Sequence, residues 1–338
     1  MKKAKGIAAL ILSVATVLSF TACSGTNASS GTAGGSTANK TLKIDVIQLV
    51  EHEALDGAYK GFVAGLKDAG YEDGKNIKID FQNAQGEQPN CVTIANKFVN
   101  EKPDLILAIA TPAAQACANA TKDIPILITA VTDPATSKLV QSNEKPGTNV
   151  SGTSDLTPVK EQIDMIKQIV PSAKTVGLMY CSSEANSKFQ IDIAKKECDA
   201  QGIKYIEKTV SNSNEIQQVA QSLVGKVEAV YIPTDNMLAA GMTTVTNVLN
   251  QAKIPVIAGE SGMVKKGGLA TYGINYYKLG QQTAAMAVKI LKGQSKPADM
   301  PIEYQKDMDV TINQDVAKQL GITIPKELLD KASSASSK

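Results

Sequence analysis

The sequence predicts an α/β fold of two similar lobes, each a parallel sheet with helices on both faces, joined by a three-strand hinge. Short β-rich runs alternate with amphipathic helical patterns from Lys43 onward, which is typical of a parallel sheet covered by helices. The same order then recurs, because the segment 104–126 has a close echo in the segment 228–256. Residues 41–338 are also too many for one comfortable core.

The elements of the first lobe follow from hydrophobic spacing and from turn residues. Gly70 ends the first helical pattern, and Pro89 suits the first turn of the second. The predicted strands are 43–50, 76–82, 104–110 and 125–130, and the predicted helices are 55–69, 89–100 and 112–120.

The second lobe repeats this pattern after Thr157-Pro158, which supplies an N-cap and a first-turn proline for its opening helix. Its predicted strands are 175–180, 203–208, 228–232 and 255–258, and its predicted helices are 184–200, 215–224 and 236–250.

The C-terminal segment is predicted to return to the first lobe and then to cross again. It carries a helix at 278–292, a short strand near 303–306 and a last helix near 313–320. The three hinge strands are expected near 150–154, 272–275 and 306–310. The first lobe would comprise 41–152 and 275–306, the second 153–274 and 307–330, with 331–338 a disordered tail.

The N-terminus reads as a lipoprotein export signal. Three lysines precede a short apolar stretch that ends in Thr21-Ala22-Cys23, where small residues before a cysteine are typical of a cleavage site. We expect residues 1–22 to be removed and Cys23 to carry the lipid anchor. The Ser/Gly/Thr-rich segment 23–40 would be a flexible tether. The alternative is a short transmembrane anchor. Lipidation would hold the protein on the extracytoplasmic face of the cell membrane.

Composition excludes several function classes. All 35 basic residues are Lys and nearly balance 33 acidic ones, which argues against a nucleic-acid surface. The chain has no Arg and no Trp, so neither a bidentate guanidinium clamp nor an indole platform is present. His52 is the lone histidine, which gives little support to a metal site or a histidine-dependent enzyme. We expect no cofactor. The cysteines at 91, 117, 181 and 198 are interpreted as free, mostly buried thiols.

Several polar runs at predicted strand ends carry a family resemblance. They are QLVEHEALD (48–56), QNAQG (82–86), AIATPAAQ (108–115), TAVTDP (129–134), SSEAN (182–186), PTDN (233–236) and GINYY (273–277). The chain resembles the ABC-transporter substrate-binding lipoproteins of the tryptophan/tyrosine-binding group over 43–325. The resemblance implies a periplasmic-binding-protein fold of the three-crossover type. It also implies capture of a small molecule outside the membrane, with an ABC permease and ATPase as partners.

A ligand is expected where the strand ends of the two lobes face each other. A zwitterion fits, because helix N-termini and hydroxyls can hold a carboxylate, while Asp235 is the first choice for an ammonium group, with Glu260 and Asp133 behind it. The alternative is that the Ser, Thr and Asp residues are helix caps. The tyrosines at 180, 231, 276 and 277 are interpreted as core or hinge packing. The predicted ligand-binding residues are Glu51, His52, Thr111, Thr132, Asp133, Ser182, Ser183, Asn186, Thr234, Asp235, Glu260 and Asn275.

The predicted function is therefore solute capture for an ABC importer by a monomer, with a free amino acid favoured and an aromatic one suggested by the resemblance. Two alternatives stay open: a ligand-sensing lipoprotein that presents its ligand to a receptor, and an importer component for another solute such as a nucleoside. An enzyme on the same scaffold has no supporting motif.

Overall fold

The computed structural model describes residues 41–336. The predicted signal peptide, tether and lipidation site Cys23 therefore lie outside the described residues. The first sheet has the strand order β11-β5-β4-β3-β1-β2, and all neighbouring strands in it are parallel. Its strands are β1 (Leu42–Gln48), β2 (Ile77–Asn83), β3 (Leu105–Ile109), β4 (Ile126–Val131), β5 (Val150–Ser154) and β11 (Glu303–Tyr304).

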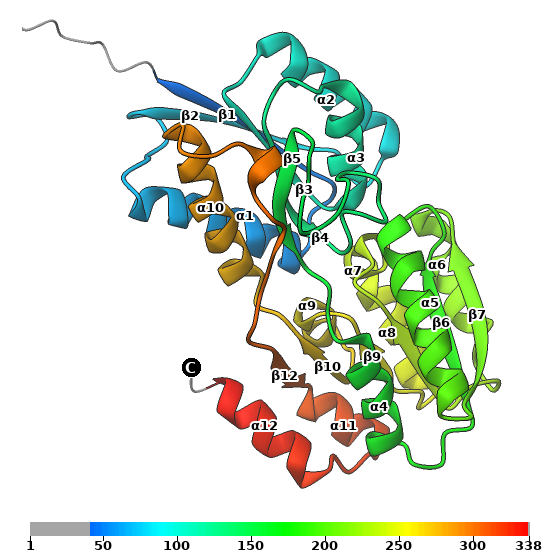
Figure 1. Cartoon of the computed structure of the whole chain (residues 1–338). Coiled ribbons are helices and arrows are strands. Elements are labelled where there is room, and N and C mark those ends of the chain that lie inside the picture. Colours follow the sequence, from blue (N-terminus) through cyan, green and yellow to red (C-terminus); the bar gives the residue numbers. More distant parts are fainter. Residues whose placement is uncertain (1–40, 337–338) are drawn as a thin grey trace, which may run out of the picture. The chain divides into compact units, whose positions relative to one another are not determined.

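Helices cover both faces of this sheet, and together they form what we call the first lobe (Figure 1). They are α1 (Glu53–Asp68), α2 (Gln88–Glu101), α3 (Thr111–Ala120), α10 (Tyr276–Leu291) and the short helix Pro297–Asp299. Helices α1 and α10 lie side by side and approach closely at two glycines. A Cβ atom on Gly61 would lie 1.9 Å from the carbonyl oxygen of Tyr277, and one on Gly280 would lie 2.0 Å from that of Ala58. The C-terminal return to the first lobe is thus confirmed.

The second sheet has the order β12-β10-β9-β8-β6-β7 and, with its helices, forms the second lobe. Its strands are β6 (Thr175–Cys181), β7 (Lys204–Val210), β8 (Ala229–Ile232), β9 (Val256–Ala258), β10 (Ala270–Gly273) and β12 (Asp309–Ile312). The prediction of a wholly parallel sheet is wrong at its edge, because β12 pairs antiparallel with β10. Gly273, where β10 ends, is paired with Asp309, where β12 begins, so β12 enters the sheet from the end at which β10 leaves it.

The helices of the second lobe match the predicted pattern with three corrections, apart from the start of the first of them, where the N-cap is Pro158 and the predicted Thr157 cap is not formed. They are α4 (Val159–Ile169), α5 (Ala185–Ala200), a short helix Ser213–Glu215, α6 (Ile216–Gln221), α7 (Asn236–Ala240), α8 (Met242–Gln251), α9 (Ser261–Lys265), α11 (Gln314–Leu320) and α12 (Lys326–Ser336). The predicted helix 236–250 breaks at Gly241, where a Cβ atom would lie 2.4 Å from Cδ1 of Ile216. Helix α9 was not predicted.

The third correction concerns the C-terminus, where α12 extends to Ser336 and replaces most of the predicted disordered tail. Leu328 is 4% exposed and packs in the second-lobe core, and Leu329 and Ala332 lie against the same core. An ion pair between Glu327 and Lys331, one helical turn apart, adds a small local contribution. The apolar face of this helix is therefore covered, which an unstructured tail would not achieve.

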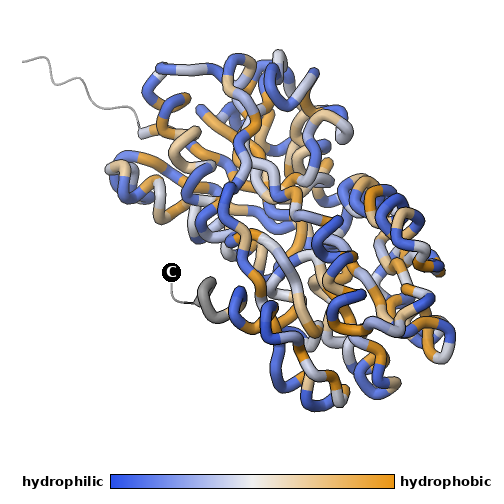
Figure 2. The backbone as a smooth tube through the Cα atoms, turned by 60° about the horizontal axis from the view of Figure 1, so that its bottom comes forward, coloured by the Kyte–Doolittle hydropathy of each residue, from blue (hydrophilic) through white to orange (hydrophobic). Residues whose placement is uncertain are grey.

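The core consists of the central strands and the helix faces that cover them (Figure 2). Every residue of β3 and β4 is buried, as expected of parallel strands covered on both faces. The four cysteines of the described chain are free and buried, as predicted, and burial raises the pKa of each thiol. In the part of the chain that the structure covers, no helix has both the length and the apolar character needed to cross a membrane.

The chain passes between the sheets three times, from β5 to α4, from β10 to α10 and from β11 to β12. These are the three predicted hinge crossings. Asp155 lies in the first crossing, Tyr276 directly follows the second, and the 305–308 segment forms the third. Two of the crossings therefore place side chains in the region where the strand ends of the two sheets meet.

Candidate functional site

The loops after several strands of both sheets meet around one small cavity. Its volume is about 10 Å³, room for about one water. The first lobe contributes the start of α1, the end of β4 and the start of α10, while the second lobe contributes the β8–α7 loop and the start of α9. The lining residues are His52, Leu55, Ala130, Asp155, Thr234, Asp235, Asn236, Ala239, Glu260 and Tyr276.

Six of the predicted binding residues lie at or beside this cavity. His52, Thr234, Asp235 and Glu260 line it. Thr132 donates its hydroxyl to Oδ1 of Asp155 at 3.0 Å, and its Oγ1 lies 3.4 Å from Oγ1 of Thr234. Asn186 lies one layer further out and donates to the carbonyl oxygen of Thr234 at 3.1 Å.

The other six predicted residues are not among those that line the cavity. Thr111 is 1% exposed at the start of α3, and its Oγ1 has no hydrogen-bond partner among the described residues. Asp133 accepts from the backbone N–H of Thr136 at 2.7 Å, so it serves its own loop. Asn275 caps α10 by accepting from the N–H of Lys278 at 3.1 Å. Glu51, Ser182 and Ser183 are exposed.

Asp235 has a structural role that revises the sequence expectation. It caps α7, because its Oδ1 accepts from the N–H of Leu238 at 2.8 Å. Its Oδ2 accepts from the N–H of Cys181 at 2.6 Å and from the hydroxyl of Ser187 at 2.7 Å. Its two oxygens are thus engaged by three internal donors, and the capping alternative fits this residue better than pairing with a ligand.

Two further buried carboxylates also serve helix starts. Glu260 caps α9 by accepting from the N–H groups of Gly262 and Met263. Glu184 accepts from the N–H of Met237 at 3.0 Å and from that of Asn236 at 3.2 Å, at the start of α7. Burial raises the pKa of both Glu184 and Glu260 to about 7. The first-turn N–H groups of α7 and α9 are therefore already occupied by the protein's own acidic side chains.

His52 is a neutral, buried residue at the cavity wall. It is 6% exposed, and burial lowers its pKa to about 4. Its Nε2 lies 3.3 Å from Oδ1 of Asn236, which belongs to the other lobe. If Nε2 carries the proton for this contact, Nδ1 is an acceptor, and it has no partner among the described residues.

Three residues of this region were not predicted from the sequence as binding residues: Asp155, Gln190 and Tyr276. Asp155 is 4% exposed and receives hydrogen bonds from Thr132 and from the hydroxyl of Tyr276, the latter at 2.7 Å. Gln190 donates to Oγ1 of Thr234 at 2.6 Å. Asp155 directly follows the first predicted hinge strand, and Gln190 lies one helical turn beyond Asn186. The sequence positions of Asp155 and Gln190 could therefore have indicated that both residues lie near the binding region.

Two larger hollows adjoin the cavity and share wall residues with it. One, of about 490 Å³, shares Asn236 with the cavity and has apolar walls that include Leu49, Val50, Pro89, Pro112 and Met237. The other, of about 960 Å³, shares His52, Glu260 and Tyr276 and is lined by many charged groups. An ion pair between Glu53 of α1 and Lys265 of α9 borders this second hollow and links the two lobes.

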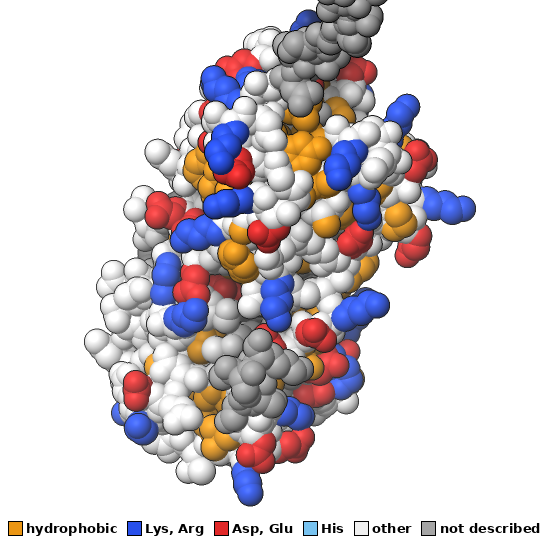
Figure 3. Space-filling view, turned by 90° about the vertical axis from the view of Figure 1, so that its left-hand side faces the viewer, with side chains coloured by type: hydrophobic (Ala, Val, Ile, Leu, Met, Phe, Trp, Pro, Cys, Tyr) orange, Lys and Arg blue, Asp and Glu red, His pale blue; other side chains and the backbone are white. Residues whose placement is uncertain are grey.

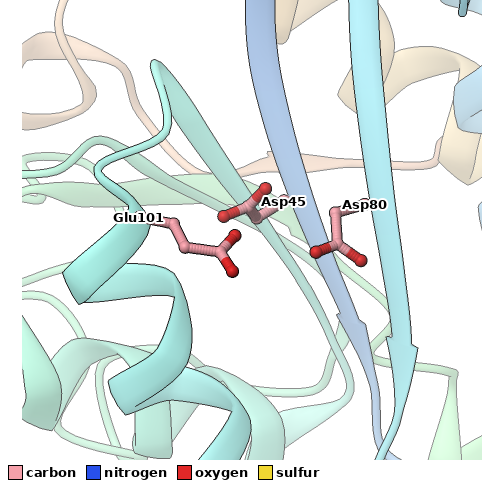
Figure 4. Close-up of side chains that lie close together, drawn as sticks. All are labelled: Asp45, Asp80 and Glu101. Atoms are coloured by element: carbon pink, nitrogen blue, oxygen red, sulfur yellow. The ribbon is translucent and has the colours of Figure 1, made fainter.

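One acidic cluster lies away from the cavity, on the bodies of β1 and β2. Figure 4 shows Asp45, Asp80 and Glu101 of α2 pointing toward one another. Lys43 pairs with Asp45 at 3.3 Å and also with Glu101, and Lys97 pairs with Asp80 and Glu101. Two lysines thus already neutralise most of its charge, and we interpret the cluster as an ion-pair network.

The surface carries no single-sign region on the face shown in Figure 3, where lysines and acids are interspersed. This agrees with the near balance of 35 basic and 33 acidic residues in the sequence. It gives no support to a nucleic-acid partner, which requires a clustered basic patch.

Known proteins resemble this chain along most of its length. A tyrosine-binding protein of Clostridioides difficile is 46% identical over 324 residues, which cover 95% of this chain and 93% of that protein. A solved ABC domain from Streptococcus pneumonia, in complex with L-Trp, is 41% identical with a TM-score of 0.84, covering 87% of this chain and 99% of that one.

A third relative is a substrate binding protein with adhesive properties from Clostridium difficile, solved in a ligand-free, open form. It is 53% identical with a TM-score of 0.65, and the match covers 84% of this chain and 96% of that one. The two-lobed fold is that of the periplasmic binding proteins, and such proteins bind solutes rather than transform them. The ABC transporter substrate binding protein family matches residues 43–336. The chain therefore belongs to the family of ABC transporter substrate-binding proteins.

Proposed function

We propose that this protein captures a free amino acid, with an aromatic one favoured, outside the cytoplasm and delivers it to an ABC permease and ATPase. The observation that carries the proposal is the buried cavity at the strand ends of both lobes, where carboxylates from the two lobes gather without a basic partner in its lining. A ligand with a positive group supplies the charge that such a lining lacks.

The carboxylate end of an amino acid needs donors, and α1 and α3 offer them. Both helices begin without a side-chain cap, at His52 and Ala110 respectively. First-turn N–H groups of a helix attract anions, and the buried, unpartnered hydroxyl of Thr111 adds a donor at the start of α3. We propose that the ligand carboxylate lies on this first-lobe side, since the starts of α7 and α9 are occupied by Glu184 and Glu260.

The hollow of about 490 Å³ supports an aromatic side chain as the third recognised group. Its volume lies within the range of about 300–1,000 Å³ that is typical of small-molecule sites. Its apolar walls come from both lobes, including Leu49 and Pro112 of the first and Met237 of the second. The tyrosine- and tryptophan-binding relatives described above support the same ligand class.

The comparisons also support closure around the ligand. The chain matches the L-Trp complex with a TM-score of 0.84 but the open, ligand-free relative with only 0.65, although the second is the more identical in sequence. Contacts such as Thr132 with Thr234 and Glu53 with Lys265 join the lobes in this structure. We propose that these contacts form on ligand binding and separate when the ligand leaves.

Calorimetric titration of the purified full chain tests the ligand class. We expect L-tyrosine or L-tryptophan to bind, and leucine or valine to bind less tightly. Sugars and nucleosides serve as controls of similar size without an amino-acid backbone. Tight binding of a nucleoside with no response to amino acids would overturn the proposal. Co-purification of a permease with the membrane-bound chain would separate an importer from a sensor.

We further propose that Cys23 is lipidated and that the protein acts as a monomer on the outer face of the cell membrane. The support is the sequence of the first 23 residues, which resembles a lipoprotein signal. Cys23→Ala should give a released protein or an unprocessed precursor, as seen by fractionation and mass spectrometry. A processed variant that stays on the membrane would contradict the anchor, and sedimentation of the detergent-solubilised protein would test the monomer.

A further inference from the structure

We propose that Asp155 is the residue that binds the ammonium group of the ligand and sets the preference for amino acids over their des-amino analogues. This inference rests on the proposed function and names a specificity-determining residue of that same site. The charged group expected from sequence was Asp235, and the geometry points to a different carboxylate at the crossing between the lobes.

Asp155 lies where the chain leaves β5 for the second lobe, and its side chain lines the cavity. It is 4% exposed. Its Oδ1 accepts the hydroxyl of Thr132 at 3.0 Å, and its Oδ2 accepts the hydroxyl of Tyr276 at 2.7 Å. Each carboxylate oxygen has a second lone pair, so both can accept from an ammonium group in the cavity without losing these partners.

The three carboxylates of the cavity lining differ in what they do for the fold. Asp235 caps α7 and Glu260 caps α9, and both accept from backbone N–H groups at the start of their helix. Asp155 is not the N-cap of a described helix, and its two side-chain partners are hydroxyl groups from other segments. A local capping role therefore explains the burial of Asp235 and Glu260 but not that of Asp155.

The surroundings of Asp155 make a cation its natural partner. The groups that face the cavity with it are the neutral imidazole of His52, the hydroxyls of Thr234 and Tyr276, and the carboxylates of Asp235 and Glu260. No lysine is among the residues of that lining. An ionised carboxylate is expensive to bury unpaired, and pairing with an ammonium group offsets that penalty. The acceptor Nδ1 of His52 adds a further site for an N–H donor.

Asp155 also lies at the hinge, so the residue that we propose to bind the ligand belongs to a segment that connects the lobes. Asp155 lies in the first crossing and Tyr276 directly follows the second, so the hydrogen bond between them connects two of the three crossings. A ligand held by Asp155 is thus in contact with the segments about which the lobes would move.

The test pairs two proteins with two ligands. The full-length wild type and Asp155→Asn are titrated with L-tyrosine and with 3-(4-hydroxyphenyl)propanoate, which lacks the ammonium group; L-tryptophan and 3-indolepropanoate form a second pair. In the wild type, loss of the ammonium group should weaken binding about tenfold to a hundredfold. In Asp155→Asn, the amino acid should lose most of that advantage, while the des-amino analogue binds about as in the wild type.

The control is Asp192→Asn, which removes one negative charge from an exposed ion pair on α5 and should leave the discrimination between the two ligands unchanged. Equal weakening of both ligands by Asp155→Asn would indicate a structural role and overturn the inference, as would full retention of the preference for the amino acid. If Asp155→Asn fails to fold, the wild type is titrated with N-acetyl-L-tyrosine, in which the amino group carries no charge. Binding of this compound as tight as that of L-tyrosine would overturn the inference. A wild type that binds neither amino acid overturns the proposed function and this inference with it.

Discussion

The helices whose starts we propose to lie near the ligand differ between the two lobes in how their first-turn N–H groups are satisfied. In the second lobe, α7 is capped by Asp235 and α9 by Glu260, so acidic side chains occupy the N–H groups that could otherwise hold an anion. In the first lobe, α10 is capped by the neutral side chain of Asn275, while α1 and α3 start at His52 and Ala110 without a side-chain cap among the described residues. The starts of α1 and α3 thus keep N–H groups that no side chain caps, unlike the starts of α7 and α9.

This difference predicts the orientation of the proposed ligand between the lobes. Its carboxylate fits the uncapped first-lobe helices, and its ammonium group fits the acidic side of the cavity, where Asp155 lies at the crossing between lobes. A zwitterion that bridges the lobes stabilises their contact through both ends.

Asp235→Ala should destabilise the second lobe, because Asp235 accepts three buried hydrogen bonds there. It removes the acceptors of the Cys181 and Leu238 N–H groups and of the Ser187 hydroxyl, all of them buried. We expect a loss of about 3 kcal/mol in the free energy of unfolding, measured by urea denaturation. Asp315→Ala, at a position that is 95% exposed, should change it by less than about 0.5 kcal/mol. An unaltered urea midpoint for Asp235→Ala would refute the capping role.

Raising the pH should destabilise the ligand-free protein, because the buried acids Glu184 and Glu260 then lose their protons. The pKa of Glu184 and of Glu260 is about 7 in the folded state, against an ordinary value of 4.5. The folded state therefore binds more protons than the unfolded state between these values, and its stability falls as the pH rises from about 4.5 to 7. His52 opposes this, because its folded pKa of about 4 makes its contribution grow between about 4 and 6.5.

Burial also raises the pKa of Asp45 to about 6, which acts in the same direction as the two glutamates. The acids therefore outweigh the one imidazole, and we expect a net loss of roughly 1–3 kcal/mol in the free energy of unfolding across the window, measured by thermal unfolding at a series of pH values. Glu260→Gln should flatten the profile, because it removes one of the titrating acids. Saturating L-tyrosine should also flatten it. A melting temperature that rises steadily from pH about 5 to about 7 would contradict the assignment.

Thr111→Val tests whether the start of α3 in the first lobe binds the ligand carboxylate. The hydroxyl of Thr111 is buried and has no hydrogen-bond partner within residues 41–336, so an isosteric apolar side chain should leave the stability unchanged or raise it by up to about 1 kcal/mol. Binding of the amino acid should weaken about tenfold if this hydroxyl donates to its carboxylate. Thr244→Val, on the exposed side of α8, is the matched control. Undiminished affinity would remove Thr111 from the site.

Glu53→Gln should have the smallest effect. The ion pair of Glu53 with Lys265 links the lobes, but the two side chains are 44% and 62% exposed. Exposed pairs contribute about 0.2–1 kcal/mol, so affinity should fall by less than about fivefold at low salt and remain unchanged at high salt. Calorimetry at two salt concentrations measures this. A salt-independent loss of binding would mean that Glu53 contacts the ligand.

Much of the fold could be predicted because its signals are local. Alternating β-rich and amphipathic segments depend on residues a few positions apart, and Gly70 and Pro89 mark helix ends by backbone constraints alone. The break at Gly241 escaped prediction, because only the approach of Ile216 from another helix requires a glycine there. The antiparallel pairing of β12 escaped it too, since strand direction depends on where the chain re-enters the sheet.

The two-lobe organisation and the polar groups at the strand ends could be predicted from the sequence, and six of the predicted residues lie at or beside the cavity. The role of each polar group depends on contacts that only the folded chain makes. A cap and a ligand contact require the same residue types at the same strand ends, so Asp235 could not be assigned until its three donors were seen. Asp155 and Tyr276 are 121 residues apart and meet only because two hinge crossings place them together. A hydrogen bond between distant segments leaves no local pattern, because its partners share no spacing along the chain.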